Sequence, residues 1–199
     1  LTVVHNGEKL TFRHPPYGLG TYSQVKDLIE NPENNPGLET PTLAQTASLV
    51  YAAFNSSDRY SEEIKGIMRN SWLWPFTGLL YVPNEGAYIK DKPETRNGMP
   101  YMNKFDLIER LKQEDPSVRF VRFGFKTGEQ TSRELEINPF VIGLAGEEGA
   151  QKLAEVAEKF KLEPYLHAFD SVDREETRVS VLSSDRNLDG RLGVDGDDH

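Results

Sequence analysis

The chain has 199 residues, no cysteine and a formal net charge of -9 at pH 7. This length can bury one sizeable core, and the lack of cysteine excludes disulfides, thiol catalysis and cysteine-type zinc sites. The negative charge opposes association with nucleic acid or anionic lipid, which depends on Lys and Arg meeting phosphate. No apolar run approaches a membrane span, and the first ten residues lack a signal-peptide layout. We therefore expect a soluble, cytoplasmic protein without a membrane or nucleic-acid partner.

Residues 1–78 are predicted to form a hairpin and a helical segment that pack on the main domain. Asn6-Gly7 between two β-prone runs is typical of a tight hairpin turn. Capping signals then predict three helices, the first with Ser23 as its cap and the second with Thr40 as its cap. These expected helices cover Ser23–Glu30, Pro41–Phe54 and Ser61–Asn70.

Residues 79–182 are predicted to form an α+β core. From Ala87 onward the pattern is strand, helix, strand, strand, helix, strand, which is the split βαβ order of a ferredoxin-like antiparallel sheet. The helix after Asn103 is expected to bury Phe105, Ile108 and Leu111. Arg119 and Arg122 are expected opposite Glu134 and Glu136. The expected elements cover Leu79–Val82, Ala87–Lys90, Asn103–Glu114, Val118–Phe125, Glu134–Leu144, Glu147–Lys161 and Pro164–Phe169, with an edge strand over Thr177–Leu182.

Pro139 raises an alternative for the second half of this core. A proline interrupts a strand ladder, so Phe140–Leu144 could begin a new strand. That strand, the helix after it and Pro164–Phe169 would then form a parallel βαβ unit, and the fold would be α/β.

Residues 183–199 are rich in Asp and Gly and are expected to form an acidic tail. Asp185, Asn187 and Asp189 follow the spacing of the first positions of an EF-hand calcium loop, where alternate oxygen ligands surround the ion. The twelfth position, which normally holds a bidentate Glu, is Gly196, and its neighbours Asp195 and Asp197 are the candidate substitutes. The pattern predicts weak calcium binding by Asp185, Asn187, Asp189 and Asp195. The alternative is a solvated tail without a ligand.

Trp72, Trp74 and Phe76 form the densest aromatic cluster of the chain. Such side chains can stack on a sugar, a base or a peptide, so they are candidate binding residues. The alternative is a core plug between the helical segment and the sheet, because aromatic side chains dominate burial.

His167 lies near two carboxylates, Asp170 and Asp173, at the end of a predicted strand. A His beside a carboxylate can perform acid-base chemistry, so these residues, with Tyr17 or Tyr22, make up a candidate enzyme site. The alternative is a hydrogen-bonded structural His.

Two segments, NSWLWPFTG from Asn70 to Gly78 and GLAGEEGAQKLAEVA from Gly143 to Ala157, resemble stretches in an archaeal family of hypothetical proteins. The resemblance implies an intracellular protein of unassigned role and brings no activity and no site residues. The residues themselves contain no catalytic motif. They favour a non-enzymatic binding or interaction module, whose partner would be another protein or a second copy of the chain, over an enzyme or a calcium-binding protein.

Overall fold

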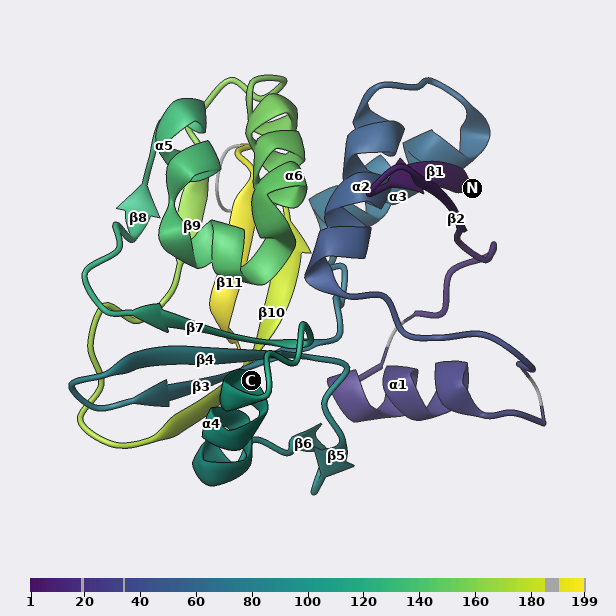
Figure 1. The fold of residues 1–199 in the computed structure, drawn as a ribbon. Coiled ribbons are helices and arrows are strands. Elements are labelled where there is room, and N and C mark those ends of the chain that lie inside the picture. The colour runs from purple at the N-terminus through teal and green to yellow at the C-terminus, as the bar shows by residue number, and fades with distance from the viewer. Residues whose placement is uncertain (19, 34, 185–189, 199) are drawn as a thin grey trace.

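The computed structural model describes residues 1–18, 20–33, 35–184 and 190–198. The protein is α+β, as predicted, and its helices surround a curled, mixed sheet (Figure 1). Within the described residues, the helices are α1 (Tyr22–Glu30), α2 (Leu43–Phe54), α3 (Arg59–Asn70), α4 (Lys104–Lys112), α5 (Ser132–Ile137) and α6 (Pro139–Ala157). None of these helices combines the length and apolar character that crossing a bilayer requires.

The main sheet has seven strands in the order β7-β4-β3-β10-β11-β9-β8. All neighbouring strands are antiparallel except β11 and β9, which are parallel. The strands are β3 (Thr77–Val82), β4 (Gly86–Asp91), β7 (Val118–Arg122), β8 (Gly128–Glu129), β9 (Tyr165–His167), β10 (Glu176–Ser183) and β11 (Gly193–Asp198). Two small antiparallel sheets pair β1 (Thr2–His5) with β2 (Glu8–Thr11), and β5 (Thr95–Arg96) with β6 (Met99–Pro100).

This sheet order differs from the ferredoxin-like order that we predicted. The expected strand Glu134–Leu144 is helical, because Thr131 and Glu134 form a capping box for α5 and Asn138 caps α6 with Pro139 in its first turn. The alternative parallel βαβ unit is wrong for the same reason. Arg119 therefore does not pair with Glu134; it binds the Asp91 carboxylate and donates to the Gly143 carbonyl at 2.8 Å.

Two other strand predictions also need correction. The run Thr177–Leu182 was expected at an edge, but β10 lies in the middle of the sheet between β3 and β11. Part of the expected acidic tail forms β11, which inserts between β10 and β9. The calcium-loop residues 185–189 lie outside the described residues.

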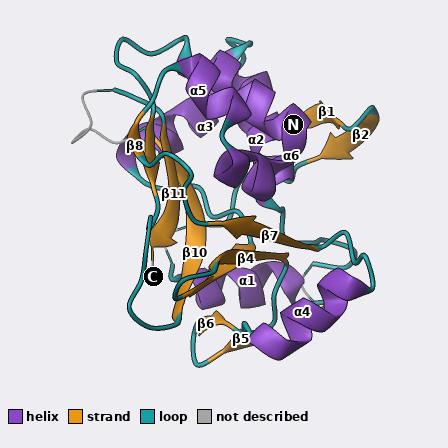
Figure 2. Ribbon diagram, turned by 60° about the vertical axis from the view of Figure 1, so that its left-hand side comes forward, coloured by secondary structure: helices purple, strands orange, loops and turns teal. Residues whose placement is uncertain are grey.

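Helices lie on both faces of the curled sheet (Figure 2), and a cluster of buried apolar residues lies on each face. Side chains alternate along β3, so Leu79 and Tyr81 face α6 whereas Leu80 and Val82 face α4. Every residue of β3 is buried as a result. Phe105, which we expected inside, is 80% exposed, and Leu107 is buried in its place.

Helix α2 packs against α6, and the hairpin of β1 and β2 contacts both of these helices. The predicted Asn6-Gly7 hairpin is confirmed, with both residues at positive φ (49° and 78°). Gly149 of α6 faces α2, and a Cβ there would lie in ordinary van der Waals contact, 3.7 Å, with Ala47. The three predicted N-terminal helices are present as α1 to α3, but the caps of α1 and α2 are Thr21 and Thr42.

Candidate functional site

A large cavity opens between the N-terminal hairpin, helices α1 to α3 and the extended segment before β3. Its volume is about 1210 Å³. Ligand pockets for small molecules usually enclose about 300–1,000 Å³, so this cavity has room for a drug-sized molecule. Irregular segments supply much of its wall, namely residues 12–18, 37–41 and 71–76.

Aromatic side chains form one wall of the cavity. Leu73 lies between Trp72 and Trp74 in the chain, and its backbone pairs with that of Leu182 of β10. Because side chains alternate along an extended chain, Trp72, Trp74 and Phe76 can share one side of this segment. The ring centroids of Trp72 and Trp74 are 6.1 Å apart at a near-perpendicular 77°. The segment thus presents a continuous edge-to-face aromatic surface.

Tyr22, the first residue of α1, extends this surface. Its ring lies 5.9 Å from that of Trp74 and 5.0 Å from that of Phe76. The Tyr22 side chain is buried, and its hydroxyl has no hydrogen-bond partner among the described residues. Burial, and secondarily the nearby Glu30 charge, raises the pKa of Tyr22 well above its usual value. The hydroxyl therefore stays protonated, and it lies buried behind the cavity wall.

The three predicted binding residues differ in exposure. Trp72 is 50% exposed and Trp74 is partly buried, whereas Phe76 is only 1% exposed. Phe76 packs with Val25 and Val179, so it is a core residue behind the wall. Trp72 and Trp74 are the members of the cluster that a ligand can reach.

Polar groups also line the cavity. His14 Nε2 is 2.6 Å from a carboxylate oxygen of Glu63, and the His14 ring meets Tyr60 edge to face at 4.6 Å. Arg13 lies over the ring of Tyr17 at 4.6 Å. The lining thus combines apolar surface with a few polar groups.

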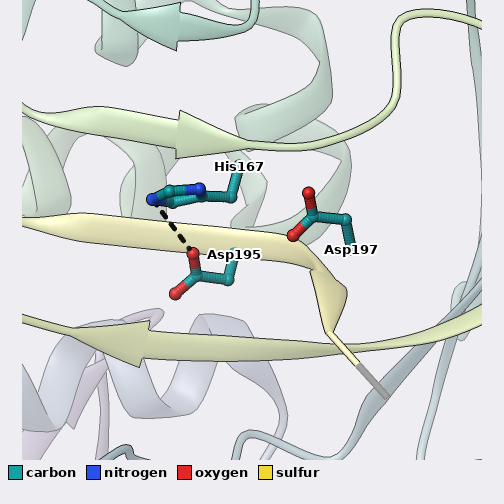
Figure 3. Close-up of side chains that lie close together, drawn as sticks. All are labelled: His167, Asp195 and Asp197. Atoms are coloured by element: carbon teal, nitrogen blue, oxygen red, sulfur yellow. Dashed lines mark ion pairs between the residues drawn. The ribbon is translucent and has the colours of Figure 1, made fainter.

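A second constellation lies on the sheet, away from this cavity. His167 at the end of β9 faces Asp195 and Asp197 of β11 (Figure 3). His167 Nε2 is 3.6 Å from Asp195 Oδ1. One potential ligand atom from each of the three side chains lies within 4.8 Å of the others. The group is half-buried, and the geometry suits a shared metal ion or a proton-sharing network.

Burial dominates the electrostatics of this group. Desolvation lowers the pKa of His167, although the charges of Asp197 and Asp198 oppose the shift. Desolvation also raises the pKa of Asp197, with His167 acting in the other direction. Burial therefore favours a neutral imidazole, the form that binds metals, and makes the Asp197 carboxylate costly without a positive partner.

The structure separates the residues that we grouped as an enzyme site. Asp170 and Asp173 lie on the exposed loop after β9, and Asp170 accepts a hydrogen bond from Ser171. Tyr17 and Tyr22 line the cavity instead, and Figure 1 places α1 well apart from β9. The residues that do meet His167 come from the segment that we read as a calcium loop and tail.

Sequence reasoning missed two components of these sites. The cavity depends on how irregular segments meet, which residue patterns do not encode. The pairing of His167 with Asp195 depends on a long-range register between β9 and β11. Of the four predicted calcium ligands, Asp185, Asn187 and Asp189 lie outside the described residues, and only Asp195 is placed. Calcium binding by that loop stays a prediction.

Comparison with known proteins adds no family to this description. No family model, no curated protein and no solved structure matches the chain. The resemblance of Asn70–Gly78 and Gly143–Ala157 to archaeal hypothetical proteins therefore stays a prediction.

Proposed function

We propose that the protein is a non-enzymatic binding module that takes up an apolar small molecule in the cavity beside Trp72. The observation that carries the proposal is a cavity of about 1210 Å³ with a wall of aromatic rings that pack edge to face. Ligand sites are typically concave and mostly apolar, with a few polar groups that fix orientation. This cavity has those attributes.

The chemistry of the wall narrows the ligand class. Indole rings that pack edge to face present apolar surface suited to a flat aromatic or an extended hydrocarbon body. Arg13 also lines the cavity, and its guanidinium can only donate hydrogen bonds. The ligand class is therefore an apolar molecule with at least one hydrogen-bond acceptor.

The two tryptophans make this proposal easy to test. The chain has only two tryptophans, and both line the cavity. The neutral probe N-phenyl-1-naphthylamine should accept energy from them, and its binding should saturate at one molecule per chain. Trp72→Ala should weaken binding, measured by calorimetry, by up to about tenfold, because one aromatic contact contributes about 0.5–1.5 kcal/mol beyond area.

A matched control separates the cavity from general surface hydrophobicity. Phe105 is more exposed than Trp72 and does not line the cavity. Phe105→Ala should leave probe affinity unchanged. Binding that does not saturate, or that falls equally in both variants, would show that the probe only coats apolar surface. A protein partner or a second copy would then be the better occupant, and sedimentation across a concentration range would detect self-association.

A further inference from the structure

We propose that His167, Asp195 and Asp197 form a binding site for a divalent first-row transition metal such as zinc or manganese. The site is independent of the aromatic cavity. It also differs from the predicted calcium loop, since it needs His167 and not residues 185–189.

Strand register builds the first half of the site. β9 and β11 are the parallel pair of the main sheet, and His167 lies directly opposite Asp195 in their register. Paired residues on neighbouring strands project from the same face, so the imidazole and the carboxylate meet without a loop. Two rigid elements thus hold two of the three ligands.

The position of Gly196 shows which face of β11 carries Asp195. A Cβ at Gly196 would lie 2.8 Å from the Phe140 ring, so this position faces α6. Its neighbour Asp195 then projects from the opposite face, because side chains alternate along a strand. The Tyr81 hydroxyl stabilises this part of β11 by donating a hydrogen bond of 2.8 Å to the Gly196 carbonyl.

An irregularity in the ladder places Asp197 beside the pair. In the pairing of β10 with β11, Val181 lies opposite Asp195 and Val179 lies opposite Asp198, so the register shifts between these two pairs. Such irregularities commonly re-aim a side chain at a functional site. Figure 3 shows the Asp197 carboxylate on the same side of the strand as the imidazole.

The spacing and donor types define the metal class. Zinc binds nitrogen and oxygen ligands at about 2.0–2.2 Å, so two of its ligands lie roughly 3–4 Å apart. The 3.6 Å between His167 Nε2 and Asp195 Oδ1 falls in that range, and a carboxylate oxygen of Asp197 lies within 4.8 Å of both of these side chains. Imidazole suits zinc, iron and copper, whereas all-oxygen sites suit calcium and magnesium. One His with two carboxylates therefore favours a transition metal.

A neighbouring hydroxyl supports one of the ligands. Ser183 of β10 lies 3.4 Å from the second carboxylate oxygen of Asp195. Groups that orient metal ligands in this way are a usual part of metal sites. A bound ion would link β9 to β11 and would offset the charge of the half-buried Asp197.

The test is calorimetry of the full chain with zinc and manganese, with calcium as a comparison ion. We expect one transition-metal ion per chain, bound at least about tenfold more weakly in His167→Gln, Asp195→Asn and Asp197→Asn. Asp170→Asn removes the same charge from the exposed loop nearby and should bind like the native chain. No stoichiometric binding, or binding that His167→Gln leaves unchanged, would overturn the site. Calcium binding alone, lost in Asp185→Asn, would also overturn it and favour the C-terminal loop.

A second measurement does not depend on the variants folding. The chain has four histidines. Substoichiometric Mn²⁺ added to the native protein should broaden the NMR resonances of the His167 imidazole before those of the other three. Preferential broadening of another histidine would place the ion elsewhere and would contradict the proposal.

Discussion

The two sides of the protein use similar aromatic residues to different effect. On the α6 side, the Phe140 ring stacks on that of Phe125 at 4.5 Å and is completely buried. On the N-terminal side, Trp72 and Trp74 line an open cavity, and Trp72 is half exposed. Helix α6, strands β3 and β11 and the segment that carries Phe125 meet around Phe140, whereas irregular segments supply much of the surroundings of Trp72. Regular elements interdigitate to crystal-like density, and the irregular segments leave space for a ligand.

The sharpest way to test this contrast is to remove one aromatic ring from each side. Phe140→Ala should destabilise the protein by about 3–5 kcal/mol, because it removes buried surface and leaves a void among rigid neighbours. Trp72→Ala should cost about 1 kcal/mol or less, because half of the side chain is already in water. Urea unfolding of the two variants measures both values. Equal costs would mean that the cavity wall is packed as tightly as the core.

Two glycines offer a second comparison, with effects of opposite sign. Both lie inside helices, Gly143 in α6 and Gly66 in α3. A Cβ at Gly143 would lie 2.6 Å from Val121 and 2.9 Å from Ile89, whereas a Cβ at Gly66 meets nothing within 4 Å. Gly143→Ala should therefore cost about 1–3 kcal/mol through overpacking. Gly66→Ala should stabilise by up to about 1 kcal/mol, because alanine favours the helix.

Thermal denaturation of the two glycine variants measures the sign of each stability change. A rise in melting temperature for Gly66→Ala and a fall for Gly143→Ala would confirm the difference in packing. A rise for both would show that α6 can move away from β4 and β7 at little cost.

Local signals predicted the parts of the fold that depend on few residues. The Asn6-Gly7 turn, the Asn103 cap of α4 and the hairpin of β3 with β4 all follow from short patterns and are present. The failure at Glu134–Leu144 is instructive, because two local signals competed there. Alternating Leu135 and Ile137 favoured a strand, but the capping box and the Asn138 cap favour helices, and the helices formed.

The sites were harder to predict than the elements. The alternation of Trp72, Trp74 and Phe76 can be read from the sequence, but the exposure of each ring depends on α1 and β10 packing around them. His167 was recognisable as a candidate, yet its partners depend on β11 inserting between β9 and β10. Long-range strand pairing of this kind leaves no pattern in either segment alone.

The smallest expected effect concerns the caps of two helices on the two sides. The box at α5 uses a charged residue: Glu134 accepts a hydrogen bond from the Thr131 amide at 2.8 Å and pairs with Lys126. The box at α1, beside the cavity, uses the neutral Gln24 with Thr21. The hydrogen bond from Lys126, and then the one from Thr131, lowers the pKa of Glu134 from 4.5 to about 2.

This difference predicts that, of these two capping boxes, only the one at α5 makes a contribution to stability that depends on pH. Because the folded-state pKa of Glu134 is depressed, its stabilising contribution is present above pH 4.5 and is lost as the pH falls towards 2. The melting temperature of Glu134→Gln should therefore lie slightly below that of the native protein at pH 7 and converge with it in that acidic window. Gln24→Ala should lower the melting temperature by the same small amount at every pH, since Gln24 does not titrate. A constant gap for Glu134→Gln would mean that packing, rather than the charge, holds this end of α5.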